Sequence, residues 1–386
     1  MNPPLRIGMV THYMPPHVGG IEHVADMLFA AYREAGCAVR WVASRVPTAA
    51  QRRDGERIRV RAWNGLERFG IPWPVWGWKG ARELERLVAC ADVVHIHDCL
   101  YLGSALASLF ARRARKPVLL TQHIGFARYP SALVNGIEGL AYRTLGRAVL
   151  AGASHVAFAT PASATFVTEL LNGRPGAASD VPNGIETGRF RPPTGAERSA
   201  ARGRFGLPGS GRVVLFVGRL VEKKGAGLFV EVSRRLPAHH FFMVGDGPLR
   251  PPALENLTWL PFAEPERMHL VYRAADAFLL PSRSEGYPVS VLEAMATGVP
   301  VIAPVGHAFA RELVERQACL LAGRTEAELS EALGSLLATP DLARSIAARA
   351  REIVVEEHSR DVMAQRYLAI CTALWRASLA ASGPGR

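Results

Sequence analysis

Short apolar runs alternate along the chain with longer segments in which apolar residues recur every three or four positions. The clearest runs are Leu5–Val10, Ala38–Ala43, Val213–Val217 and Phe241–Val244. They predict buried strands, and the periodic segments between them predict amphipathic helices, such as those ending near Ala35 and Leu236. Strand and helix patterns that alternate in this way are typical of an α/β fold with parallel sheets. At 386 residues the chain has the length of two or three domains.

Two further apolar runs, Ala277–Leu280 and Val299–Ala303, enclose a short apolar helix with proline before it and glycine after it. Glu285 lies in the turn before this helix and Glu293 lies inside it. A carboxylate inside an apolar helix is costly unless it has a partner. The helix is expected to begin at the carboxyl edge of a parallel sheet, where such sheets bind ligands. Two acceptor-only groups there suit a polyol, whose neighbouring hydroxyls one carboxylate can bind.

A basic cluster follows the strand Val213–Val217. Gly218, Arg219 and Lys224 precede the next helix, and cations at a helix entry are well placed to bind a diphosphate. On its own, the cluster is better interpreted as a basic loop followed by a solvated helix start. After the strand Phe241–Val244, the turn Gly245-Asp246-Gly247 is either a close approach of backbone to a nucleotide or a plain β-turn, and the two readings weigh about equally for Asp246.

The N-terminal half carries two similar signals. Gly19 and Gly20 lie between the first strand and its helix, where glycines let backbone approach a phosphate and the helix start offers unpaired N–H groups. The G-x-G-x-x-G fingerprint of dinucleotide-binding proteins is absent there. His123 closes a strand that begins near Val118. A lone histidine at a strand end is often structural, but its place after a strand in the same half as the glycine pair favours a functional role.

Taken in order, these segments resemble the retaining glycosyltransferases of family 4. The resemblance rests on Glu285-x7-Glu293, on the Pro-Ser before it and on the Glu-Ala-Met-Ala-x-Gly-x-Pro-Val that begins at Glu293. It implies a GT-B fold, in which two Rossmann-like α/β domains face a cleft. Residues 1–182 would form the acceptor-side domain and residues 185–360 the nucleotide-sugar domain, with a helix over 361–379 crossing back to the first. The chain departs from the family at Glu186, which replaces the usual Asp, and at His307, where a second glycine is usual.

The same resemblance assigns roles to residues. Glu285 would hold the donor sugar, Glu293 the nucleotide ribose, and Arg219 and Lys224 the diphosphate. The residues that it places in catalysis are His123, Arg219, Lys224 and Glu285. The residues that it places in donor binding are Gly19, Gly20, Gly218, Arg219, Lys224, Gly245, Asp246, Gly247, Glu285, Gly286, Tyr287 and Glu293.

The expected activity is transfer of a sugar, with retention, from a UDP- or GDP-linked donor to a glycan or lipid-linked acceptor in polysaccharide or glycolipid biosynthesis. No Asp-x-Asp occurs in the chain, so we expect no metal, and no cofactor beyond the nucleotide-sugar donor itself. Alternatives are another GT-B enzyme, such as a nucleotide-sugar epimerase, or a non-catalytic sugar-binding protein. The second is disfavoured because Arg219, Lys224 and Glu285 are all present.

Charge and composition restrict the expected binding partners and cellular location of the chain. The net charge is +12, and residues 1–180 hold 21 Lys and Arg against 13 Asp and Glu, or +8. Aromatic residues and cations mix between Trp63 and Lys79, so this stretch is either a membrane or sugar surface or a loop folded onto its own domain. No nucleic-acid-binding motif accompanies the charge. Five cysteines without a C-x-x-C pair, no apolar run long enough for a membrane span, and no visible signal peptide predict a cytoplasmic protein. The basic N-terminal half adds the expectation of peripheral contact at the inner face of the membrane.

Overall fold

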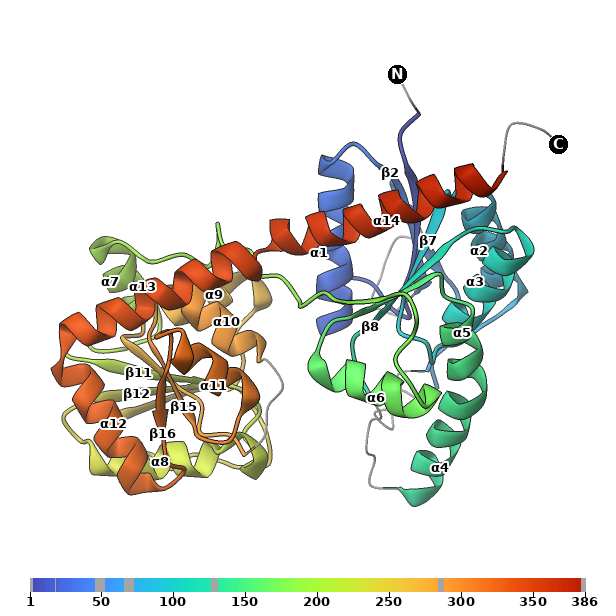
Figure 1. The fold of residues 1–386 in the computed structure, drawn as a ribbon. Coiled ribbons are helices and arrows are strands. Elements are labelled where there is room, and N and C mark those ends of the chain that lie inside the picture. The colour runs from blue at the N-terminus through green and yellow to red at the C-terminus, as the bar shows by residue number, and fades with distance from the viewer. Residues whose placement is uncertain are drawn as a thin grey trace. The chain divides into compact units, whose positions relative to one another are not determined.

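The computed structural model describes residues 3–17, 19–45, 53–65, 73–125, 131–283 and 288–382. The chain packs into two compact units, residues 1–184 with 361–386 and residues 185–360 (Figure 1). Each unit is built on a mostly parallel β-sheet with helices packed against it. The predicted α/β class and the two Rossmann-like halves are therefore confirmed.

The first unit contains an eight-stranded sheet in the order β10-β9-β8-β7-β1-β2-β4-β3. Its strands are β1 (Arg6–Val10), β2 (Ala38–Ser44), β3 (Arg53–Asp54), β4 (Arg57–Val60), β7 (Val93–His97), β8 (Val118–Gln122), β9 (His155–Phe158) and β10 (Ala178–Asp180). All neighbours pair in parallel except β3 and β4. The order reverses between β1 and β7, and ligands of open parallel sheets bind beyond the carboxyl ends of the strands at such a reversal.

Successive side chains of these strands point to opposite faces, so the sheet has two apolar cores. One face packs against α1 (Gly20–Glu34) and α14 (Arg360–Ser382), and Met363, Tyr367 and Cys371 of α14 are buried there. The other face packs against α2 (Trp78–Cys90), α3 (Leu102–Arg113), α5 (Arg147–Ala151) and α6 (Pro161–Leu171). The segment at the C-terminal end of the chain thus completes the core of the first unit.

The aromatic stretch between Trp63 and Lys79 is only in part a loop. Strands β5 (Ala62–Trp63) and β6 (Val75–Trp76) pair as a small antiparallel ribbon, and α2 begins directly afterwards. Trp76 is buried and its indole Nε1 donates to Ser44 Oγ at 2.6 Å, whereas Trp63 and Trp78 are 59% and 66% exposed. Trp76 therefore belongs to the core of the first unit, Trp73 is partly buried against that core, and Trp63 and Trp78 remain on the surface. Arg68 and Phe69 lie outside the described residues.

The second unit contains a fully parallel six-stranded sheet in the order β13-β12-β11-β14-β15-β16. Its strands are β11 (Val213–Val217), β12 (His240–Val244), β13 (Leu257–Leu260), β14 (Ala277–Leu279), β15 (Val301–Pro304) and β16 (Leu320–Ala322). Its helices are α7 (Gly195–Arg204), α8 (Ala226–Arg235), α9 (Met268–Arg273), α10 (Val289–Ala296), α11 (Ala308–Glu315), α12 (Glu326–Ala338) and α13 (Pro340–Glu357). Here the order reverses between β11 and β14, which places the loops that follow these strands at the expected ligand edge.

Candidate functional site

Three loops at the carboxyl edge of the second unit's sheet touch backbone to backbone. Gly245 has φ +136°, and a Cβ there would fall 2.0 Å from the Gly218 carbonyl oxygen. A Cβ on Gly247 would fall 2.4 Å from the carbonyl oxygen of Leu220. The Leu220 N–H also donates to the Asp246 carbonyl at 2.9 Å. The glycines of this turn are therefore required for the loops after β11 and β12 to pack against each other.

The loop after β11 also packs against the loop after β14. Gly225 has φ +76°, and a Cβ there would fall 2.1 Å from the Pro281 carbonyl oxygen. The Arg283 N–H donates to the Lys223 carbonyl at 2.8 Å. Lys224 lies in the short 3₁₀ turn Glu222–Lys224, and its Cδ lies 3.9 Å from the position of a Cβ on Gly218. The basic segment is thus held at the sheet edge, with Lys224 beside Gly218 and the Arg219 side chain exposed.

The Asp246 carboxylate stabilises its own turn. It accepts from the Gly247 N–H at 2.8 Å and pairs with Arg250 at 2.5 Å. These contacts, the backbone bond first, hold the pKa of this exposed carboxyl below its usual value. The side chain therefore has a structural explanation, and any nucleotide contact of this turn stays a prediction.

Glu293 lies in α10 and has a partner that sequence reasoning missed. The hydroxyl of Tyr272, on α9, donates to Glu293 Oε2 at 2.7 Å. Burial raises the pKa of the Glu293 carboxyl to about 7, and the Tyr272 hydroxyl and the charge of Arg189 pull it the other way. Nothing in the local sequence links these two residues, because they lie on different helices. Tyr272 is fully buried on α9 and contacts Glu293 on α10.

Glu285, Gly286 and Tyr287 lie outside the described residues, so their roles remain expectations of the sequence. The two residues at which the chain departs from the family pattern, His307 and Glu186, lie within the described residues. His307 is buried, and its Nε2 lies 3.1 Å from the Ser282 carbonyl, which ties the loop after β15 to the loop after β14. Glu186 pairs with Arg189 at 3.3 Å.

The paired glycines of the first unit have an acidic neighbour. Gly19 is the N-cap of α1, and a Cβ there would fall 2.2 Å from Glu22 Oε2, so a side chain at this position would displace the carboxylate. Glu22 is buried, and its Oε1 lies 2.8 Å from His17 Nδ1 and 3.5 Å from His12 Nε2. Burial alone would raise the pKa of Glu22, but the two histidines and its own N–H offset this and lower it. An anionic group thus already lies at the helix start where a phosphate was expected.

His123 lies in a buried polar cluster at the carboxyl ends of β7 and β8. Its Nε2 lies 2.9 Å from Nδ1 of His97, and its N–H donates to Asp98 Oδ1 at 2.8 Å. Asp98 has φ +61°, a strained conformation for a residue other than glycine that occurs often at functional sites. His97 Nε2 and Asp98 Oδ2 are buried and have no hydrogen-bond partner among the described residues. The sequence pattern identified His123 but gave His97 and Asp98 no role.

Burial sets the protonation states of this cluster. It lowers the pKa of His123 to about 3, with a further contribution from nearby His12, and it lowers the pKa of His97 well below its usual value. Both rings are therefore neutral at physiological pH, so one donates the hydrogen bond that the other accepts. Burial raises the pKa of Asp98 to about 7, although two backbone N–H groups oppose the shift.

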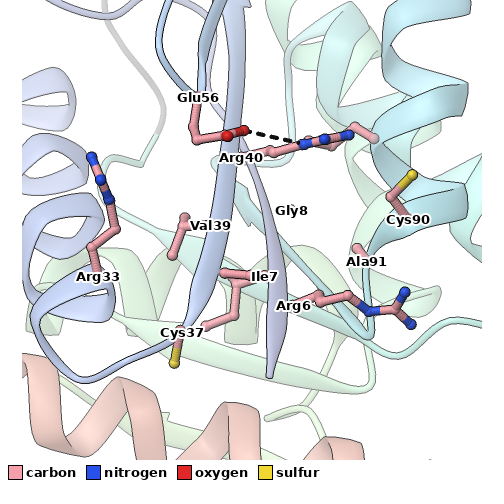
Figure 2. Close-up of a pocket in the computed structure, with 12 residues that line it drawn as sticks. Arg6, Ile7, Gly8, Arg33, Cys37, Val39, Arg40, Glu56, Cys90 and Ala91 are labelled. Carbon is pink, nitrogen blue, oxygen red and sulfur yellow. Dashed lines mark hydrogen bonds and ion pairs between the residues drawn. The ribbon is translucent and has the colours of Figure 1, made fainter. Parts of the chain in front are cut away.

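A separate cavity of about 500 Å³ lies near the amino ends of β1 and β2, away from these groups (Figure 2). Two of the arginines that line it are paired, Arg40 with Glu56 at 3.2 Å and Arg6 with Asp92 at 2.6 Å. It contains none of the predicted site residues. In each unit, we therefore place the candidate site residues at the carboxyl edge of its own sheet. Within the residues that the structure describes, no group of three His, Cys, Asp or Glu side chains is arranged to hold a metal ion.

Both units resemble known glycosyltransferases. Residues 18–189 match the family model described as Glycosyltransferase Family 4, and residues 211–339 match the one described as Glycosyl transferases group 1. A D-inositol 3-phosphate glycosyltransferase of Nocardia farcinica is 29% identical over 340 residues, covering 81% of this chain and 74% of the relative. The protein of the same name from Mycobacteroides abscessus is 29% identical over 74% of this chain and 68% of its own length.

Solved structures share the fold across almost the whole chain. Sucrose-phosphate synthase from Thermosynechococcus elongatus superposes with a TM-score of 0.71 at 20% identity, covering 97% of this chain and all of that one (100%). Anabaena Alr3699/HepE in complex with UDP-glucose superposes with a TM-score of 0.70 at 16% identity over 96% of this chain and 100% of its own. At these identities the likeness establishes the fold.

Proposed function

We propose that this glycosyltransferase of the GT-B fold belongs to family 4 and moves a hexosyl group, with retention, from a UDP- or GDP-linked sugar to an acceptor hydroxyl. The observation that carries the proposal is the packing of the loops after β11, β12 and β14, which requires Gly225 and Gly245 and holds Lys224 at the sheet edge. A rigid basic edge of this kind suits a diphosphate.

In the proposed reaction the bond between the anomeric carbon and the diphosphate oxygen breaks, and the acceptor oxygen forms the new bond. Negative charge grows on the leaving diphosphate, and Arg219 and Lys224 stabilise it because they are in place beforehand. The acceptor proton leaves with the diphosphate. Glu285 positions the sugar. The family's retention of configuration is expected to follow from attack on the face that the diphosphate leaves.

Glu293 is proposed to bind the ribose. Its Oε2 accepts from Tyr272, so a ribose hydroxyl would use the other oxygen, Oε1. The bond from Tyr272 fixes the direction of the carboxylate, which favours a single ribose orientation. His123 is proposed to bind the transferred sugar as a neutral ring, because the pKa of its imidazole, about 3, keeps it uncharged.

The acceptor is proposed to present uncharged hydroxyls to the first unit. The relatives are named for D-inositol 3-phosphate, a phosphorylated acceptor. Here the buried carboxylate Glu22, whose lowered pKa keeps it ionised, lies with histidines at the carboxyl edge of the sheet, and an anionic carboxylate repels phosphate and accepts hydrogen bonds from hydroxyls. We therefore favour the neutral sugar of a glycan or lipid-linked acceptor at this position.

Transfer assays test both the proposed reaction and the proposed acceptor. Wild-type protein is incubated with each UDP- or GDP-sugar and with myo-inositol, D-inositol 3-phosphate, neutral oligosaccharides or a lipid-linked sugar, and nucleoside diphosphate release is measured. We expect release to depend on a neutral acceptor. Efficient transfer to D-inositol 3-phosphate alone would contradict the acceptor assignment while leaving the donor site intact. Conversion of the donor sugar to its epimer without any acceptor would contradict the reaction itself.

A further inference from the structure

Helix α4 (Ala132–Ala141) turns its aliphatic side chains outward. Leu133, Ile137 and Leu140 are 74%, 51% and 64% exposed. Residues spaced by four and three positions lie along one face of a helix, so the three form a continuous apolar stripe, which we call the α4 stripe. Isolated exposed leucines are ordinary, but a stripe on one helix face usually marks a surface that binds something apolar.

The opposite face of the helix is anchored in the first unit. Glu138 is buried, and so is Tyr142, in the π-helical turn Tyr142–Gly146 that follows. The Tyr142 ring packs edge-on against Phe166 with ring centroids 4.7 Å apart, and its hydroxyl donates to the Gly125 carbonyl at 3.4 Å. A carboxylate inside and aliphatics outside reverse the usual pattern of a surface helix. The exposure of the stripe is therefore fixed by the packing of its neighbours.

In Figure 1, α4 extends from α5 away from the sheet of the first unit. Arg143 and Arg147 are exposed in the two turns that follow the stripe. The acidic residue of α4 itself, Glu138, is turned inward, and residues 1–180 carry a net charge of +8 from 21 Lys and Arg and 13 Asp and Glu. The surface that α4 offers is thus apolar with cations beside it.

We propose that the α4 stripe docks this protein on an anionic bilayer, with Leu133, Ile137 and Leu140 inserted at the level of the headgroups and Arg143 and Arg147 against acidic lipids. A second copy of the chain fits less well. Three aliphatic side chains offer much less than the roughly 800 Å² per partner of a stable interface, and the arginines would face each other. The structure contains no helix, among its described residues, that is long and apolar enough to cross a membrane, so the contact would be peripheral.

Vesicle sedimentation of the full chain tests the proposal. The probes are vesicles of phosphatidylcholine alone and of phosphatidylcholine mixed with phosphatidylglycerol. Wild-type protein should bind the anionic vesicles, less strongly as salt is raised. The variant Leu133→Ser/Ile137→Ser/Leu140→Ser should bind them at least about tenfold more weakly, since most of the apolar contact is lost. Arg143→Glu should reduce binding to anionic vesicles and leave neutral vesicles unaffected.

Matched controls keep the result specific to α4. Leu109→Ser/Leu379→Ser changes aliphatics that are 43% and 56% exposed elsewhere in the first unit and should bind as the wild type does. The far-UV circular dichroism and the thermal unfolding transitions of the triple variant should equal those of the wild type, which shows that its first unit is folded. Full vesicle binding by the triple variant would overturn the proposal, as would binding lost instead in Trp78→Ser. Wild-type dimers that the triple variant abolishes, with no vesicle binding by either, would identify the occupant as a second copy.

Discussion

At the scale of single residues, two cations in one loop are proposed to bind the diphosphate. Arg219→Ala and Lys224→Ala should each lower kcat/KM by about 10²-fold or more, the typical loss when one preorganised donor to a developing negative charge is removed. Lys223→Ala is the matched control, because Lys223 is an exposed lysine of the same 3₁₀ turn. Steady-state kinetics with the preferred donor measure the effect. Turnover near the wild-type level in both variants, or an equal loss in Lys223→Ala, would refute the diphosphate assignment.

The second prediction concerns the protonation of Glu293. Burial raises the pKa of this carboxyl from 4.5 to about 7. If the ionised form binds the ribose, affinity for an intact nucleotide sugar should rise as the pH rises through about 7, by about 1 kcal/mol for a gained charge-assisted bond. The folded chain holds this proton more tightly than the unfolded chain does. The free energy of unfolding should therefore fall as the pH rises from 4.5 to about 7.

Two variants check this assignment by calorimetry across that pH range. Tyr272→Phe removes the hydrogen bond that opposes the upward shift of the pKa, so the midpoint of the affinity change should move to higher pH. Glu293→Gln cannot ionise and should bind more weakly, with no such pH dependence. An unchanged pH profile in Glu293→Gln would show that another group titrates. Glu285→Gln, by contrast, should weaken the nucleotide sugar and leave the bare diphosphate nearly unaffected.

At the scale of elements, glycines decide how the donor edge is assembled. Gly245→Ala puts a Cβ 2.0 Å from the Gly218 carbonyl oxygen in a backbone conformation with φ +136°. It should lower the free energy of unfolding by at least about 1–3 kcal/mol and weaken nucleotide binding, because the loops after β11 and β12 must move apart. Gly209→Ala is the control, since a Cβ there meets no atom within 4 Å. Chemical denaturation measures both, and equal stability of the two variants would contradict the packing argument.

The apolar pattern predicted most of these elements because strand and helix periods are local properties. Strands β11 and β12 and helices α1 and α10 lie within a residue or so of the predicted ranges, while β15 begins at Val301 and not at Val299. The ribbon of β5 and β6 and the outward stripe of α4 were missed. A two-residue strand has too few residues to show a period. Which side of a helix is exposed depends on the elements that pack against it.

The site was predicted less completely for a related reason. The sequence motifs identified Arg219, Lys224, Glu293 and His123, which belong to short segments with recognisable neighbours. The partners Tyr272 and His97 contact Glu293 and His123 from strands or helices that are distant in sequence. Glu22 lies only five residues from its partner His17, but its burial depends on how α1 packs. Such contacts become visible only when the sheet order is known.

At the scale of the whole molecule, the chain should work without a metal ion. It contains no Asp-x-Asp, and cationic side chains are proposed to neutralise the diphosphate. Activity should therefore survive excess EDTA at its full rate. Loss of activity in EDTA that Mg²⁺ or Mn²⁺ restores would show that a divalent ion carries this charge, and the proposed roles of Arg219 and Lys224 would then need revision.

The most direct test of the account is a calorimetric titration of UDP and of GDP into wild-type protein, Lys224→Ala and the control Lys223→Ala. The account predicts that one of the two nucleotides binds the wild type at a single site without added metal. It predicts that Lys224→Ala weakens this binding strongly and that Lys223→Ala does not. Failure of both nucleotides to bind the wild type, or equal affinity in Lys224→Ala, would contradict the claim that this edge of the second unit is the donor site.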